Sequence, residues 1–270
     1  MGFKAVHISC DDTTSETLSF LLQENGYEGT SFEKNQLIAY CKISSFDSNK
    51  LKSILKPFGI KPDKIQDVNS QNWNKIWESN FVNADIGSQI HARAPFHSPK
   101  NVKHDIIISP KMAFGTGHHE TTQLSAIALE KLDCSDKVIL DMGCGSGLLA
   151  ILASQKNAKK VIAIDYDQNC IANTKENIQL NNAKNVITIQ DDSLSQVDEN
   201  LDIIVSNIVK NINLNLLPQF IKKLNNNGIL ILCGFLAEDM NVLIQESQKH
   251  GLKIIDQNTK NGWLQTQFIK

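Results

Sequence analysis

Alternating glycines between an apolar run and a helix-like segment constrain the fold of this chain more than any other feature. The apolar run 138–140 ends in Asp141, glycine then occupies every second position of 143–147, and residues 148–155 have the composition of a helix. A tight strand-to-helix turn requires positive φ angles, and a bulky ligand must approach bare backbone, so glycine suits both demands. The pattern predicts a β-strand that feeds a nucleotide-binding turn.

A second acid follows the turn. The apolar run 160–164 ends in Asp165, at a distance from the glycines where an acid can bind the hydroxyls of a ribose. A dinucleotide-binding fingerprint would place its third glycine at position 148, which is Leu148, and would not carry an acid at the position of Asp141. The spacing acid-x-Gly-x-Gly-x-Gly instead resembles motif I of the class I S-adenosylmethionine-dependent methyltransferases. The flanking strands and the following helix favour this interpretation over a glycine-rich loop without a ligand.

The composition is that of an ordinary soluble globular protein. The chain has 270 residues, of which 41% are hydrophobic and 21% charged, and its formal net charge is −2. This length predicts one large domain or two unequal ones. Arg93 is the only arginine in the sequence, which has 27 lysines and arginines together. Because arginine is the side chain best suited to phosphate and base recognition, direct nucleic-acid binding is not expected.

Six cysteines are scattered along the chain without a Cys-x-x-Cys pair or a matching histidine spacing. Neither a metal site nor a disulfide framework is therefore expected, and the cysteines are typical of buried thiols in a reducing compartment. The first residues turn polar and acidic by Asp11, and no apolar run reaches the length of a membrane span. We therefore expect a cytoplasmic protein.

The first 70 residues carry the pattern of a small α+β module. Strand-like and helix-like segments follow one another in the order β-α-β-β-α-β, at residues 3–9, 12–22, 27–32, 37–43, 51–55 and 65–68. This order predicts a ferredoxin-like domain over residues 1–70. Trp73 and Trp77 lie four residues apart in the next segment, where a linker helix over 71–84 would place both on one face as a packing anchor.

Residues 85–270 have the pattern of a doubly wound α/β domain. Two extended segments, 86–94 and 105–109, are predicted to pair as strands ahead of it. From Thr121 onward helical and strand patterns alternate, which predicts a mostly parallel sheet with helices on both faces and a ligand site at the carboxyl ends of the strands. The tetrapeptide Asn-Asn-Asn-Gly at 225–228 is expected to form a turn.

The segment 109–122 leads into the first of those helices and contains two glycines and two histidines. Thr121 and Thr122 stand where a helix would begin, so they either cap free backbone N–H groups or belong to a loop that covers the nucleotide pocket. His118 and His119 are adjacent and cannot share one helix face, which disfavours a zinc motif and favours a position at the pocket rim.

Three parts of the chain resemble the bacterial methyltransferases that modify ribosomal protein L-eleven. Residues 112–122 are similar to that family's loop ahead of motif I, and residues 140–150 with 161–167 follow its cofactor turn and second strand. Residues 203–208 resemble its fourth-strand motif, which ends in Asn-Ile or Asn-Leu. The tryptophan pair and Phe81 match the spacing of its linker. The resemblance covers essentially the whole chain, most strongly its middle part.

The resemblance implies S-adenosylmethionine as the cofactor and the ribosomal protein as the substrate, with methylation of lysine ε-amines and/or the N-terminal α-amine. The enzyme is expected to be a monomer whose N-terminal domain docks the substrate. The family holds its cofactor with the second threonine of the loop, the first glycine of the turn, the acid after the second strand and the fourth-strand asparagine. In this sequence those positions are Thr122, Gly143, Asp165 and Asn207.

The chemistry of these residue types agrees with cofactor binding. Asp165 can accept both ribose hydroxyl protons, and glycine at positions 143 and 145 (Gly143 and Gly145) leaves room for a ligand against the backbone. Asp192, next to Asp191 after a predicted strand, can accept from the amino group of the adenine; a solvated turn is an equal alternative for either acid.

Asn207 ends a predicted strand at the crevice, where a neutral amide can contact the cofactor and orient the attacking amine; an ordinary turn asparagine is the alternative. Methyl transfer from a sulfonium is an in-line displacement with a neutral leaving group, so alignment and a deprotonated amine are the main demands. A lysine is protonated at neutral pH, and desolvation in a closed pocket would lower its pKa. His118, His119 or water could take the proton.

Two other functions fit the same pattern. The glycine turn identifies the cofactor and not the acceptor, so a methyltransferase that acts on another protein or on a small-molecule amine is the main alternative. A binding module that kept the fold and lost turnover is the second, and the presence of all four cofactor positions speaks against it. We therefore expect an active protein N-methyltransferase.

Overall fold

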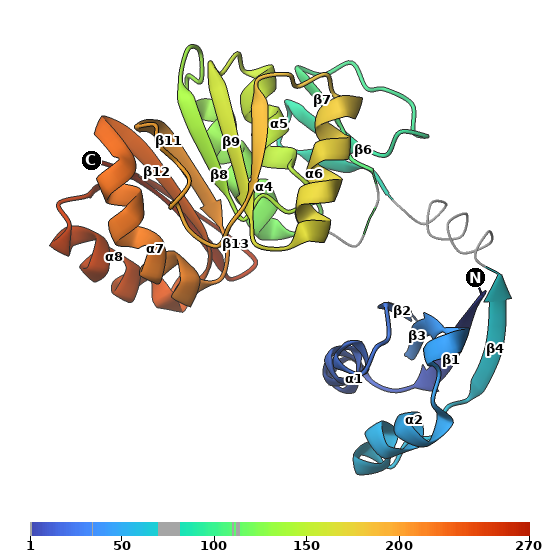
Figure 1. Ribbon diagram of the computed structural model, residues 1–270. Helices are drawn as coiled ribbons and strands as arrows, with labels where there is room; N and C mark the ends of the chain where they lie inside the picture. Colours follow the sequence, from blue (N-terminus) through green and yellow to red (C-terminus); the bar gives the residue numbers. More distant parts are fainter. Residues whose placement is uncertain (1, 34, 70–81, 110, 112–113) are drawn as a thin grey trace. The chain divides into compact units, whose positions relative to one another are not determined.

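The computed structural model describes residues 2–33, 35–69, 82–109, 111 and 114–270 (Figure 1). The chain divides into two compact units, Met1–Phe81 and Val82–Lys270, and each is described by itself. The predicted linker helix lies, up to position 81, outside the described residues, and so do both of its tryptophans.

The smaller unit is a four-stranded antiparallel sheet with strand order β2-β3-β1-β4. Two helices connect the strands, and the order along the chain is β1 (Gly2–Ser9), α1 (Asp12–Glu24), β2 (Gly29–Glu33), β3 (Gln36–Lys42), α2 (Ser48–Leu55) and β4 (Lys64–Asn69). Both helices begin after an aspartate whose side chain accepts backbone N–H groups of the first turn, Asp11 for α1 and Asp47 for α2. Alternate strand residues such as Val6 and Ile8 form the core with the apolar faces of these helices.

The larger unit is built on a seven-stranded sheet with strand order β10-β9-β8-β11-β12-β14-β13 (Figure 1). Its elements are α4 (Glu120–Lys131), β8 (Val138–Met142), α5 (Leu148–Gln155), β9 (Lys160–Asp165), α6 (Gln168–Leu180), β10 (Val186–Gln190), β11 (Leu201–Asn207), α7 (Lys210–Lys223), β12 (Leu224–Leu236), α8 (Met240–Lys249), β13 (Lys253–Lys260) and β14 (Trp263–Ile269). Strands β8 to β12 pair in parallel, and β14 runs antiparallel to both of its neighbours. This confirms the predicted mostly parallel, Rossmann-like sheet. Because the strand order reverses between β8 and β11, the crevice at their carboxyl ends is the expected ligand site.

Successive residues of the central strands face two separate cores. Ile139 and Val161 pack with residues of α4, α5 and α6, whereas their neighbours Leu140 and Ile162 pack with residues of α7 and α8. A strand that is buried on both faces needs apolar side chains at every position, which explains why the two strand runs in the sequence show no polar alternation. Among the helices that the structure describes, none is long and apolar enough to cross a membrane.

A three-stranded sheet precedes the main one, and it corrects one prediction. It consists of β5 (Ala84–Ile86), β6 (Ile90–Arg93) and β7 (His104–Ile107). The expectation of a single strand over 86–94 is wrong, because Gly87 has a φ of 58° and residues 87–89 form a turn that divides the segment. β6 then pairs antiparallel with β5 and parallel with β7.

The expected turn at 225–228 is also absent as a separate element. These residues belong to β12, and the irregularity appears instead as a shift of strand register. Leu201 pairs with Leu224, whereas Ile203 pairs with Ile229, and Asn227 between them has a φ of 61°. Asparagine tolerates this left-handed conformation, so the extra residues form a bulge while the strand continues.

Candidate active site

A small cleft lies at the carboxyl ends of β8 and β11. It brings together three of the predicted cofactor positions, Thr122 from the start of α4, Gly143 from the turn after β8 and Asn207 from the end of β11. The other lining residues are Phe114, Gly115, Cys144, Leu148 and Leu149. The cleft therefore has polar groups at its strand ends and apolar side chains on the side of α5.

All three glycines of the turn have positive φ angles, 74° at Gly143, 55° at Gly145 and 82° at Gly147. A Cβ atom at Gly145 would lie 2.4 Å from the carbonyl oxygen of Phe114, and one at Gly143 would lie 2.1 Å from Cγ2 of Ile208. The glycines are therefore required by packing within the protein as well as by any ligand. This second reason is not visible in the sequence, because both neighbours are distant along the chain.

Asp165 is buried and holds the turn directly. Its Oδ2 accepts from the backbone N–H of Gly145 at 2.9 Å, and its Oδ1 accepts from the backbone N–H of Asp167 at 3.0 Å. The thiol of Cys170 also hydrogen-bonds this carboxylate, so the acid has partners on the turn, on the loop after β9 and on α6. The acid predicted to bind the cofactor thus also fixes the backbone beside it.

Asp141, the acid that begins the glycine motif, is buried at the end of β8. Its Oδ2 accepts from the backbone N–H of Ala150 at 3.0 Å, but its Oδ1 is buried without a hydrogen-bond partner. Burial raises the pKa of this carboxyl to about 7, and the nearby charge of Asp165 adds to the effect. An unpartnered buried carboxylate oxygen is costly unless a donor or a cation satisfies it.

Thr122 and Asn207 meet at the end of β11, although 84 residues separate them in the sequence. The Nδ2 group of Asn207 donates to Oγ1 of Thr122 at 3.5 Å, and both side chains are buried. Asn213 in α7 supports this end of the sheet: its Nδ2 donates to the carbonyl oxygens of Ile208 and Cys233, both at 2.9 Å. These contacts of Asn213 could not be predicted from the sequence, because only the fold brings α7 to the ends of β11 and β12.

Gly145 and Asp165 are not among the residues that line the cleft, and neither are Asp191 and Asp192. Asp191 is engaged by the side chains of Ser195, Gln196 and Ser193, and the hydrogen bond from the Ser195 hydroxyl is the main reason why its pKa falls to about 2. Asp192 is exposed and is the member of the acidic pair that is turned to solvent.

The two histidines of the loop have different local roles. Both ring nitrogens of His118 are within hydrogen-bond distance of a partner, Oγ1 of Thr116 at 3.1 Å and the carbonyl oxygen of Val82 at 2.8 Å. His119 is the N-cap residue of α4 and accepts from the backbone N–H of Thr121. Its ring lies between those of Phe114 and Trp263, with both centroid distances 5.1 Å.

Comparison with known proteins extends the likeness over nearly the full length. The profile of the family described as Ribosomal protein L11 methyltransferase (PrmA) matches residues 48–270. A ribosomal protein L11 methyltransferase of Porphyromonas gingivalis is 38% identical over 267 residues, which cover 95% of this chain and 91% of the relative. One of Bacteroides fragilis is 35% identical over 268 residues, which cover 96% and 95%. The crystal structure of a ribosomal protein L11 methylase from Lactobacillus delbrueckii subsp. bulgaricus matches with a TM-score of 0.64 at 26% identity, over 70% of this chain and 98% of that one.

Proposed function

The chain belongs to the ribosomal protein L11 methyltransferase family, and from this membership we propose that it methylates amines of ribosomal protein L11 with S-adenosylmethionine as the methyl donor. One observation carries the proposal. Thr122, Gly143 and Asn207, which come from three separate elements, line one cleft at the point where the strand order reverses. This is the place where doubly wound sheets bind nucleotide-containing ligands.

The chain offers suitable groups for each part of the cofactor. Asp165 would accept from the ribose hydroxyls, and the exposed Asp192 would accept from the adenine amino group. The unpartnered Oδ1 of Asp141 supports a place for the α-ammonium group. Gly143 and Gly145 would present bare backbone to the ligand. When bound, S-adenosylmethionine supplies an electrophilic methyl group on a sulfonium.

The acceptor amine would lie at the end of β11. Asn207 is neutral, so its amide oxygen can orient an amine without holding it in the protonated state as a carboxylate would. The apolar side chains of Phe114, Leu148 and Leu149 in the lining lower the polarity of the cleft, which favours the uncharged amine that attack requires. A bound S-adenosylmethionine would supply the methyl group to the deprotonated amine, and alignment of the two would be the main contribution of the protein. His118, His119 or water would remove the proton.

We further propose that the smaller unit is a ferredoxin-like domain over residues 1–70 that docks the ribosomal protein, with a linker over 71–84 and the catalytic domain over 85–270. The β-α-β-β-α-β order and the antiparallel sheet of this unit support the assignment. The enzyme would act as a monomer in the cytoplasm without binding nucleic acid directly.

Incubation of the purified protein with methyl-labelled S-adenosylmethionine and separated ribosomal proteins tests the proposal. The expected result is label on L11, at lysine side chains, at the N-terminal amine or at both, which peptide mass spectrometry would distinguish. Label on a different protein, or on a small-molecule amine alone, would refute the acceptor. Failure to bind S-adenosylmethionine would refute the proposed function as a whole.

A further inference from the structure

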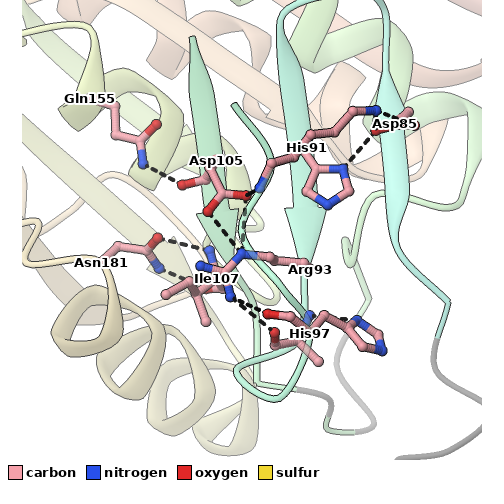
Figure 2. Close-up of polar contacts among 10 residues, drawn as sticks. Asp85, His91, Arg93, His97, Asp105, Ile107, Gln155 and Asn181 are labelled. Carbon is pink, nitrogen blue, oxygen red and sulfur yellow. Dashed lines mark hydrogen bonds and ion pairs between the residues drawn. The ribbon is translucent and has the colours of Figure 1, made fainter. Parts of the chain in front are cut away.

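Strand β7 and its continuation to Ser109 have one edge that no described strand covers. β6 pairs with the other edge, and β7 ends the order β5-β6-β7. Side-chain amides from α5 and α6 bond the open edge instead (Figure 2). Nε2 of Gln155 donates to the carbonyl oxygen of Asp105 at 3.1 Å, and Asn181 both accepts from Ile107 N at 2.8 Å and donates to Ile107 O at 2.7 Å.

The same arrangement continues along α6. Oδ1 of Asn177 accepts from the backbone N–H of Ser109 at 2.8 Å, and Nδ2 of Asn173 donates to the carbonyl oxygen of Ser109 at 3.4 Å. Four helical residues advance about 6 Å and two strand residues about 6.6 Å. Asn181 and Asn177, four residues apart, therefore meet Ile107 and Ser109, which are two residues apart on the strand edge, and Asn173 makes a second contact with Ser109.

Asn177 makes one contact that its two neighbours in this row do not make. Its Nδ2 donates to the carbonyl oxygen of Ser146, inside the glycine turn, at 2.7 Å, and its side chain is fully buried. The loop after Ser109 returns to the same residue, because Ser146 N donates to Phe114 O at 2.9 Å and Ser146 Oγ donates to Gly115 O at 2.8 Å. Asn177 thus joins the strand that enters the loop to the turn on which the loop rests.

The far side of β7 is held separately. The guanidinium of Arg93 is buried, and its Nε donates to both carboxylate oxygens of Asp105 at 2.8 Å and 3.1 Å (Figure 2). Its Nη1 donates to the carbonyl oxygen of His97 at 2.9 Å. Because these bonds hold β7 against β6, loss of the Asn177 side chain should change the conformation of the glycine turn and leave β7 in place.

We propose that Asn177 is a positioning residue for cofactor binding: it fixes the Gly145–Ser146 backbone against the loop at Phe114 and Gly115, so that both walls of the cleft keep their spacing. Without the Asn177 side chain, the buried carbonyl oxygen of Ser146 loses its donor, and the turn shifts so that this oxygen can reach a different donor. This inference rests on the proposed function, since it concerns the same cofactor site. Asn177 itself does not line the cleft.

Asn181→Ala provides a matched control, because it removes bonds to the same strand and leaves the Ser146 contact in place. Dissociation constants for S-adenosylhomocysteine by calorimetry and thermal midpoints should be measured for the parent and both variants. Both variants should lose thermal stability. Asn177→Ala should weaken cofactor binding about tenfold, which corresponds to the loss of one buried hydrogen bond. It should also raise the KM for S-adenosylmethionine with a smaller change in kcat. Asn181→Ala should change cofactor binding less than about twofold.

Asn177→Asp is a second variant that distinguishes loss of the Ser146 contact from misfolding of the protein. It keeps the shape and the acceptor for Ser109 N but removes the donor to Ser146 O, so it should weaken cofactor binding at least as much as alanine does. Unchanged binding in the folded Asn177 variants, or equal losses in Asn177→Ala and Asn181→Ala, would overturn the inference. Failure of the parent to bind either form of the cofactor would instead overturn the proposed function, and the inference with it.

Discussion

The turn after β8 and the end of β11 form two sides of the same cleft, but they are built differently. The backbone shapes the turn, with positive φ angles at three alternate glycines and a hydrogen bond from the N–H of Gly145 to Asp165. Side chains from distant parts of the chain shape the end of β11. Asn207 donates to Thr122, and Asn213 donates to the carbonyl oxygen of Ile208. We infer that the turn governs cofactor affinity, whereas the strand end governs the alignment of the acceptor.

The largest expected effect is on the backbone side. In Gly145→Ala the new Cβ would lie 2.4 Å from the carbonyl oxygen of Phe114, a backbone atom that cannot move aside cheaply. Cofactor affinity should fall by about 100-fold or more, because strain and steric conflict add at one position. Gly251→Ala is the control, since Gly251 has a φ of 78° but no atom within 4 Å of the added Cβ. If calorimetry gave the two variants equal affinities for the cofactor, the assignment of the glycine turn to the cofactor site would be wrong.

Asp165→Ala should come next. It removes the acceptor that we propose for two ribose hydroxyls and releases the N–H of Gly145. Hydrogen bonds to charged groups contribute about 1.5–3 kcal/mol each, so affinity should fall by about 10–100-fold for each ribose bond that is lost. Asp191→Ala is a suitable comparison, because that acid bonds only its own turn among the described contacts. A parental dissociation constant for Asp165→Ala would place the ribose elsewhere.

Asn207→Ala should affect the rate of methyl transfer more than the affinity for the cofactor. It should lower kcat about tenfold and change the dissociation constant of the cofactor less than about threefold, because misalignment acts on the transition state. Asn207→Asp sharpens the distinction: a carboxylate would hold the amine protonated, so the rate should be low at neutral pH and recover partly as the pH rises. Superimposable pH–rate profiles with equal rates would remove Asn207 from the acceptor site.

The smallest effect concerns Asp141, which belongs to the turn side. Its pKa rises from 3.8 to about 7 on folding, so the folded protein binds the proton more tightly than the unfolded chain. This contribution to stability is complete below the unfolded pKa and is lost as the pH rises through about 7. The free energy of unfolding of Asp141→Asn, relative to that of the parent, should therefore increase on the order of 2 kcal/mol from pH 5 to pH 8.

Urea unfolding at both pH values measures this difference. Saturating cofactor should reduce it if a cation of the ligand satisfies the free carboxylate oxygen, because binding would then favour the charged form. A parent and variant whose difference in stability is the same at both pH values would show that Asp141 does not titrate in this range.

Several features of the fold were accessible from the sequence because they depend on short-range rules. Apolar runs that end in an acid, followed by glycines or helix caps, located β8, β9 and the helices after them. The errors arose where backbone conformation departs from regular strand. The turn at Gly87 divides a segment that reads as one strand, and the bulge at Asn227 keeps a loop-like segment inside β12.

What the sequence determined by itself is the identity of the groups at the turn, since the requirement for positive φ and a following acid is local and shows directly in residue spacing. Only the tertiary structure decided which residues from distant parts of the chain contact the groups of the cleft. The contact of Asn207 with Thr122, the burial of Asp141 Oδ1 and the bridge from Asn177 to Ser146 all depend on how strands and helices pack. Such contacts leave no periodic signal, because an asparagine on a helix face has the same letter whether it meets solvent or a buried strand edge.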